Sequence, residues 1–257
     1  MRTRNIIGIL TVLVVANMAA SSAHAVLVNV NFEAFTPANQ NPPFVFATES
    51  TLSGPAGGLN TQWNQYADED SSGVVVDSTG AETSVTFTTN FSEGRRGSNA
   101  NVLPIFNSTL TDFGRTSVAR NLTINGLLAG SLHDVYIVAY RDQSTATERL
   151  SGTWTSANAT TSATSQLLDS TTTQSDLAFL DGVNFIKFSN VQADALGKIV
   201  FNAQSTFNPA ASDSNNHFRL GLSGFQIQSV APAVPEPASL TLIGLAAGGL
   251  FLRRRRA

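Results

Sequence analysis

The chain has 257 residues, a formal net charge of −3, only 13% charged residues and no cysteine. Without cysteine it has no disulfide framework, zinc knuckle, iron–sulfur cluster or thiol nucleophile. A pI near 5.6 argues against the clustered basic surface that nucleic-acid binding needs. The 42% hydrophobic content is enough for the core of one large domain or of two small ones.

The N-terminal segment has the three parts of a secretory signal peptide. A basic start precedes an apolar run over 6–20, and Ala23 and Ala25 form an A-x-A cleavage site. We expect signal peptidase to cleave after Ala25 and to remove residues 1–25. The alternative is an uncleaved membrane anchor, but the run is shorter than the roughly 20 residues that a spanning helix needs.

Alternation of apolar and polar residues predicts β-strands after this leader. Val26, Val28, Val30 and Phe32 recur with the two-residue period of a half-buried strand. The run 135–140 is apolar on both faces, which predicts a central strand that is covered on each side. Further strands are expected at 74–77, 84–88, 120–124, 184–188, 199–202 and 218–227.

Turn sequences separate these strands. The segment 77–80, Asn125-Gly126 and Asp181-Gly182 supply the positive φ that tight hairpins require. The Ser- and Thr-rich segment 155–176 fits either a long surface excursion or a pair of edge strands. Many short strands without a capped helical pattern predict an all-β fold for residues 26–230, a β-sandwich of jelly-roll type.

Trp63, Asn64 and Tyr66 are the first candidates for a carbohydrate-binding site. Indole and phenol rings can stack on a sugar while offering a polar group, and binding residues tend to lie on loops held by a rigid scaffold. The alternative is that Trp63 and Trp154 fill the core of the sandwich or its ends.

Asp68, Glu69 and Asp70 form the densest cluster of carboxylates. Several oxygen atoms from one loop suit a hard cation, so a structural Ca²⁺ is one interpretation and a solvated acidic loop is the other. The spacing of an EF-hand is absent, and no motif in the chain requires a cofactor.

The usual catalytic motifs are also absent. The chain has no G-x-S-x-G, H-E-x-x-H, Walker or G-x-G-x-x-G pattern, so we expect that it is not an enzyme. The alternative is a secreted carbohydrate-active enzyme, similar to a glycoside hydrolase, or an esterase, with its site on loops around Trp63, Asp68 and His133. Such a hydrolase needs two carboxyl groups that meet in space.

The C-terminal segment has three parts in a fixed order. Pro235, Glu236 and Pro237 precede an apolar run over 238–252, which four arginines follow: Arg253, Arg254, Arg255 and Arg256. A helix of this length rises about 22 Å, so it crosses a hydrocarbon core of about 30 Å only if the arginines snorkel or the bilayer thins. Because arginine clusters resist translocation, we expect these four to stay in the cytoplasm while the body lies outside.

This tail, residues 234–257, resembles the PEP-CTERM sorting signal of exported Gram-negative bacterial proteins. The resemblance implies that an exosortase-type membrane protease recognises the Pro-Glu-Pro motif and removes the helix and the arginines. It also implies transient anchoring in the inner membrane and delivery to the outer envelope or the extracellular polysaccharide matrix. The alternative is an ordinary tail anchor that is never processed.

The body carries a second resemblance. Its segments 28–32, 136–140 and 222–227 are similar to strands of the ectodomains of PEP-CTERM proteins, which are themselves similar to galactose-binding-like jelly rolls. Without its basic ends, the segment 26–234 has a formal charge near −8, which disfavours nucleic acid and other polyanions as partners. We expect an exported structural or adhesive protein that in addition binds carbohydrate weakly, with extracellular polysaccharide as its partner.

Overall fold

The computed structural model describes part of the chain, namely residues 26–33, 44–46, 54–57, 62–67, 72–91, 93–96, 108–114, 117–139, 150–157, 165–170, 179–208 and 218–230. Contacts divide the chain into two units: Val26–Val230, and a second unit formed by 1–25 and 231–257, which lies outside the described residues. The predicted leader and tail residues belong to this second unit. Within the described ranges, no helix is long and apolar enough to span a membrane.

The described residues form strands and no helix, and the strands make three sheets. The first has the order β12 (Phe185–Gln192), β9 (Leu132–Val138), β15 (Gly224–Ser229), β1 (Leu27–Glu33), β3 (Trp63–Ala67), β2 (Phe44–Phe46). The second has the order β11 (Ser165–Ser170), β10 (Leu150–Ser156), β13 (Ile199–Ser205), β8 (Ala119–Asn125), β5 (Glu82–Thr89), β4 (Ser72–Val76). The third has the order β14 (Phe218–Leu222), β7 (Ser108–Gly114), β6 (Glu93–Arg96).

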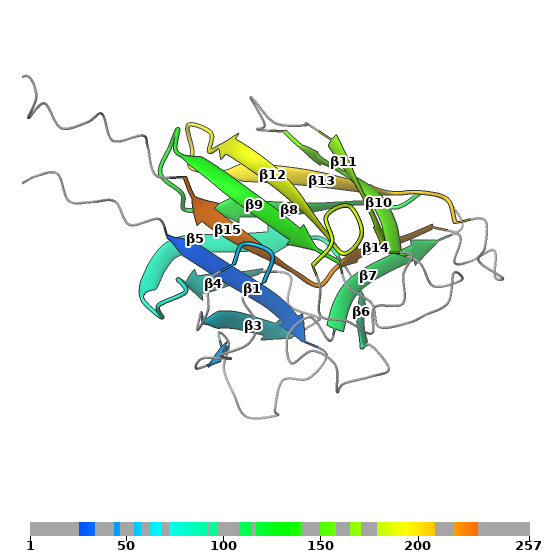
Figure 1. The fold of residues 1–257 in the computed structure, drawn as a ribbon, viewed down its shortest axis with the longest axis horizontal. Helices are drawn as coiled ribbons and strands as arrows, with labels where there is room; N and C mark the ends of the chain where they lie inside the picture. Colours follow the sequence, from blue (N-terminus) through cyan, green and yellow to red (C-terminus); the bar gives the residue numbers. More distant parts are fainter. Residues whose placement is uncertain are drawn as a thin grey trace, which may run out of the picture. The chain divides into compact units, whose positions relative to one another are not determined.

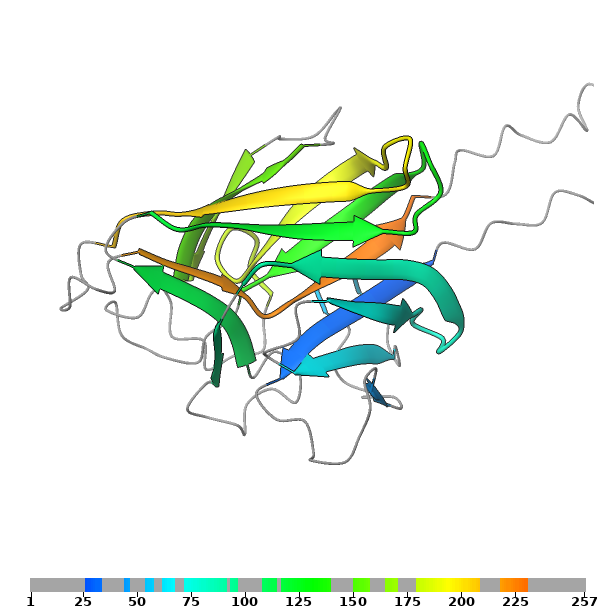
Figure 2. The same cartoon turned by 180° about the vertical axis from the view of Figure 1, so that it is seen from behind.

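We call these sheets A, B and C. Figures 1 and 2 show sheets A and B packed face to face, which confirms the predicted all-β sandwich. Neighbouring strands are antiparallel throughout, except that β1 and β3 run parallel. A parallel pair needs a crossover between its strands, and residues 34–62 provide it here.

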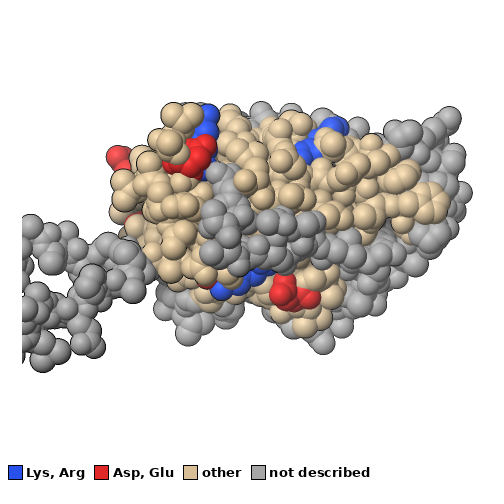
Figure 3. Space-filling model, turned by 90° about the horizontal axis from the view of Figure 1, so that it is seen from above, with Lys and Arg blue, Asp and Glu red and all other residues tan. Residues whose placement is uncertain are grey.

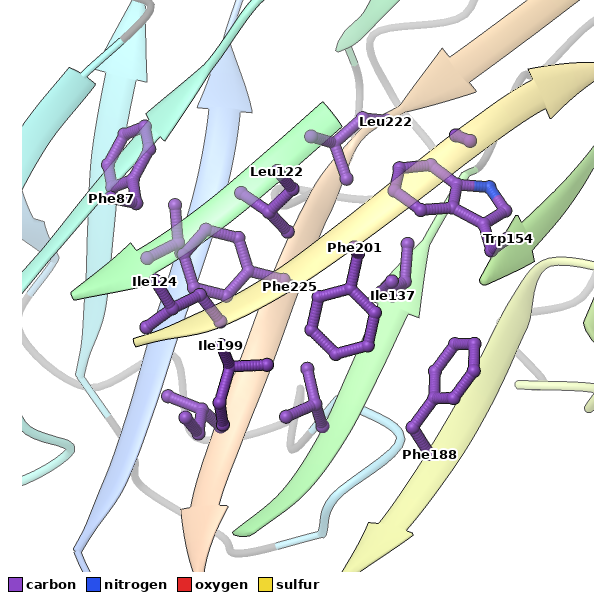
Figure 4. Close-up of a cluster of buried hydrophobic side chains, with 14 of the residues drawn as sticks. Phe87, Leu122, Ile124, Ile137, Trp154, Phe188, Ile199, Phe201, Leu222 and Phe225 are labelled. Carbon is purple, nitrogen blue, oxygen red and sulfur yellow. The ribbon is translucent and has the colours of Figure 1, made fainter. Parts of the chain in front are cut away.

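The core lies between sheets A and B and is built from aromatic and branched side chains (Figure 4). Phe87 of β5 meets Phe32 of β1 and Phe225 of β15, each with ring centroids 5.6 Å apart and an edge-to-face arrangement. Phe188 of β12 meets Phe201 of β13 at 5.0 Å. Each of these pairs joins sheet A to sheet B, and such pairs add about 0.5–1.5 kcal/mol each beyond their buried area.

The strand expected at 135–140 is central, as predicted. It appears as β9, which lies between β12 and β15, and residues 135–139 are all buried. The strand expected at 218–227 is instead two strands, β14 in sheet C and β15 in sheet A. They separate at Ser223, whose N–H donates to Val138 O at 2.7 Å and whose carbonyl accepts from Phe32 N at 2.9 Å.

The turns are confirmed in part. The segment 77–80 joins β4 to β5, and Gly80 has φ +88°. Gly126 has φ +76°, but Asn125-Gly126 does not close a hairpin, because β8 belongs to sheet B and the following β9 to sheet A. In the segment 155–176, the described residues include β11, an edge strand of sheet B.

We predict that Gly126→Ala destabilises the body much more than Gly57→Ala. Both glycines have φ near +76°, a conformation that costs an L-residue roughly 1–2 kcal/mol. A Cβ at Gly126 would lie 1.9 Å from the backbone oxygen of Ser84, whereas at Gly57 it meets nothing within 4 Å. Urea unfolding should give a loss of about 1 kcal/mol for Gly57→Ala and about 3 kcal/mol for Gly126→Ala. Equal losses would contradict this account.

Candidate functional site

The three residues expected on a carbohydrate-binding loop lie on a strand instead. Trp63, Asn64 and Tyr66 belong to β3, because this segment pairs in parallel with β1, with Val30 opposite Asn64 and Phe32 opposite Tyr66. All three side chains are buried, with relative exposures of 0%, 0% and 2%. No ring face of Trp63 or Tyr66 is open to a sugar.

Asn64 joins the two large sheets. Its Nδ2 donates to Asn29 O at 2.9 Å and to Val76 O at 2.8 Å, while its Oδ1 accepts from Val76 N at 2.8 Å. Asn29 lies on β1 of sheet A and Val76 on β4 of sheet B. The amide is thus committed to backbone groups, which is how a buried polar side chain offsets the cost of leaving water.

The neighbouring aromatic residues also pack internally. The Tyr66 ring meets Phe87 edge-to-face at 4.8 Å, and its hydroxyl donates to the carbonyl of Val74. Trp154 is fully buried and stacks on Phe91 at 6.0 Å. These positions agree with the alternative that Trp63 and Trp154 fill the sandwich.

The predicted calcium ligands Asp68, Glu69 and Asp70 lie outside the described residues, and this site stays a prediction. Within the part of the chain that the structure describes, no three His, Asp or Glu side chains gather where they could hold a metal ion.

The residues of the alternative enzyme site do not come together among the described residues. His133 lies on β9 and Trp63 on β3, and two strands, β15 and β1, separate them in sheet A. Asp68 is outside the described residues. His133 is buried, with its Nε2 2.7 Å from Ser131 Oγ and its Nδ1 3.5 Å from Ser229 Oγ.

A groove of about 280 Å³ opens instead on the outer face of sheet B. It crosses β8, β13 and β10, the face turned toward the viewer in Figure 2. The described residues that line it are Asn90, Ala119, Arg120, Asn121, Thr153, Thr155, Asn202, Ala203 and Gln204. We call this site the sheet B groove.

Strand register arranges the polar groups of the sheet B groove in two rows. Asn202 of β13 lies between Asn121 of β8 and Thr155 of β10, and Gln204 lies beside Thr153. These residues alternate along their strands with core residues, so the burial of the apolar face turns them outward. Asn90 borders the groove, and its Oδ1 accepts a 2.7 Å bond from Asn121 N.

Apart from the Arg120 guanidinium, the side chains that line the sheet B groove are uncharged. Amide and hydroxyl side chains both donate and accept, and the Arg120 guanidinium only donates. Among the described lining residues there is no carboxylate, histidine or aromatic ring. The sequence predicted two of the three strands that carry the groove, β8 and β13, but no strand at β10. Polar residues that alternate with apolar ones along these strands were the available signal, but which residues lie beside them on other strands was unknown.

We predict that His133 makes the body less stable in mild acid. Burial lowers the pKa of this side chain below 6.5, so below pH 6.5 the unfolded state binds a proton before the folded state does. The free energy of unfolding should therefore fall as the pH drops below 6.5, by at most about 1.4 kcal/mol per pH unit. Urea unfolding of His133→Gln should lack this slope, and His217→Gln should retain it. An unchanged slope in His133→Gln would contradict the assignment.

The comparisons with known proteins concern the tail and the sandwich separately. Residues 233–256 match the family model of the PEP-CTERM protein-sorting motif. No curated protein matches the chain. A solved structure of TmCBM61 in complex with β-1,4-galactotriose is similar at 8% sequence identity and a TM-score of 0.31, over 55% of this chain and 86% of that chain. The chain therefore carries a PEP-CTERM sorting motif, which marks it as an exosortase-sorted exported protein that is anchored in the membrane before processing.

Proposed function

We propose that this protein is a structural or adhesive component of the outer envelope or extracellular matrix, and that its body binds polysaccharide weakly. The sorting motif at 233–256 carries the proposal, because an exported chain that is anchored at the membrane can meet extracellular polysaccharide. The sheet B groove supports the proposed binding of polysaccharide. It offers an open surface on which a polymer can lie across several strands.

The groove suits a neutral polysaccharide best. Sugar hydroxyls both donate and accept hydrogen bonds, as do the amides of Asn202 and Gln204 and the hydroxyls of Thr153 and Thr155. A formal charge near −8 over 26–234 opposes a polyanion. Figure 3 shows how sparsely charged side chains are distributed over one face of the body.

The expected affinity per site is low. A neutral hydrogen bond contributes only about 1 kcal/mol net, since water competes for both partners. Among the described lining residues no aromatic ring adds stacking. A repeating polymer that engages many copies of the protein compensates through multivalency, which fits an adhesive role better than capture of a free sugar.

We propose no catalytic step in this groove. Glycoside hydrolysis needs two carboxyl groups on either side of the bond, and the described lining residues supply none.

Processing can be tested by the intact mass of the exported protein. We expect the mature chain to begin at Val26 and to lack the apolar run and Arg253–Arg256, because signal peptidase and exosortase remove the two ends. Glu236→Ala should retain the tail, while Glu33→Ala, a matched substitution in the body, should be processed normally. An exported protein that keeps both ends would contradict the proposal.

Polysaccharide binding can be tested by affinity electrophoresis in gels containing a neutral or an acidic polysaccharide, with and without Ca²⁺. Asn202→Ala with Gln204→Ala should weaken binding of the neutral polymer about fivefold for each lost hydrogen bond. Thr88→Ala, an exposed residue of β5 outside the lining residues given above, should leave binding unchanged. Equal migration of all variants in every gel would leave the purely structural role as the function.

A further inference from the structure

Both ends of the body lie at the same end of the sandwich. Ser229 N donates to Val26 O at 2.9 Å, and Val230 N donates to Leu132 O at 2.9 Å. The strands therefore bring together the start of β1, the start of β9 and the end of β15, at the left of Figure 1. The loops 126–131 and 193–198 lie at this end too, since β8 ends and β13 begins there. We call it the exit end.

Exposed apolar side chains gather at the exit end. Leu128 is 79% exposed and Leu196 is 77% exposed. Leu132 and Val26 are exposed by 38% and 37%. These four are the majority of the seven exposed large hydrophobic residues among those that the structure describes. Single exposed leucines need no explanation, but several at one end mark a contact surface.

The two loops are held firmly enough to present these leucines. Leu127 N donates to Gly197 O at 3.1 Å, and Gly130 N donates to Ala193 O at 3.0 Å, so each loop braces the other. The carboxylate of Asp194 accepts from Leu196 N at 2.8 Å and from Lys198 N at 2.9 Å. The leucines stand at the tips of braced turns, where neither side chain packs against the core.

Two carboxylates at the exit end accept hydrogen bonds from backbone N–H groups of their own loops. Asp194 is bonded as above, and Asp77 Oδ1 accepts from Thr79 N at 2.8 Å and from Ala81 N at 3.0 Å. Burial acts to raise the pKa of Asp77, but these bonds and one from the Thr79 hydroxyl at 2.6 Å together hold the pKa below its usual value. Glu82 is an exposed acidic residue among those described nearby, and Lys198 is half-buried.

The chain that follows the exit end is short. Only residues 231–234 separate Val230 from Pro235, and the apolar run begins at Ala238. Eight residues span at most about 29 Å when fully extended. The polar layer of a bilayer takes up about 5–8 Å on each side. A tail embedded in the membrane therefore keeps the exit end close to the lipid surface.

We propose that the exit end is a lipid-contacting surface that rests on the bilayer until exosortase releases the chain, with Leu128 and Leu196 inserted into the interface. The proposal rests on the proposed anchoring by the tail. The short tether brings this end to the membrane, and the exposed leucines supply the apolar contact that membrane-surface residues make. Val26 and Leu132 extend the contact toward the point where the chain leaves the body.

Because the chain has no cysteine, a thiol-reactive label attaches only at a cysteine that is introduced by mutation. Single substitutions Ala129→Cys and Ala195→Cys, beside the two leucines, and Ala119→Cys, an exposed residue at the opposite end, each accept one nitroxide label. The full chain is reconstituted into vesicles of phosphatidylcholine and phosphatidylethanolamine, which do not repel the acidic body. Collision rates are then measured with an aqueous nickel complex and with oxygen, which concentrates in lipid.

We expect labels at 129 and 195 to lose collisions with nickel several-fold and to gain collisions with oxygen, relative to the label at 119. Adding Leu128→Ser and Leu196→Ser should return both labels to the level at 119, while the chain still floats with the vesicles. Equal accessibility of the three labels would overturn the lipid contact, and so would protection from both reagents, which indicates a protein partner. A chain that does not float at all would overturn the anchoring itself.

Discussion

Phenylalanine rings that cross between sheets A and B hold the described body together. Phe87 and Phe201 project from sheet B and meet Phe32, Phe225 and Phe188 of sheet A. Because the chain has no cysteine, no disulfide helps to stabilise the fold. Burial of these rings decides which face of each strand points inward, and therefore which residues remain outside on β8, β13 and β10. The polar rows of the sheet B groove are a consequence of that choice.

On the outer face of sheet A, the side chains of Gln226 and Asn29 make polar contacts. Gln226 Nε2 donates to Asn29 Oδ1 at 2.7 Å, Gln226 Oε1 accepts from Ala56 N at 2.8 Å, and Asn29 Nδ2 donates to Gln62 O at 2.8 Å. Ala56 and Gln62, which lie between β1 and β3 in the chain, are thereby bonded to side chains of sheet A. Sheet B carries the open polar groove on its outer face.

The groove and the exit end lie at different places along the strands. Ala119, at the groove, begins β8, whereas Asn125 ends the strand beside the exit end. Seven residues of strand span about 20 Å. A body that rests on the membrane by its exit end would hold the groove away from the lipid, toward the polymer outside the cell. The proposed lipid contact and the proposed polysaccharide contact are therefore compatible in one molecule.

The sequence by itself determined the sorting motif and the class of fold. The motif depends on the order and composition of a short contiguous segment, and the strands of an all-β fold show in a two-residue period that is local too. The break at Ser223 is also visible in the sequence. The apolar residues fall on even positions at Leu220 and Leu222 and on odd positions at Phe225 and Ile227, so the two-residue period shifts by one residue between them. The tertiary structure decided the partners of each strand. It placed Trp63, Asn64 and Tyr66 on a buried parallel strand, assembled a groove from residues 90–204, and brought the leucines of two distant loops to one end. Strand order and register set these neighbours, and contacts between residues far apart in the chain leave no periodic pattern in the sequence.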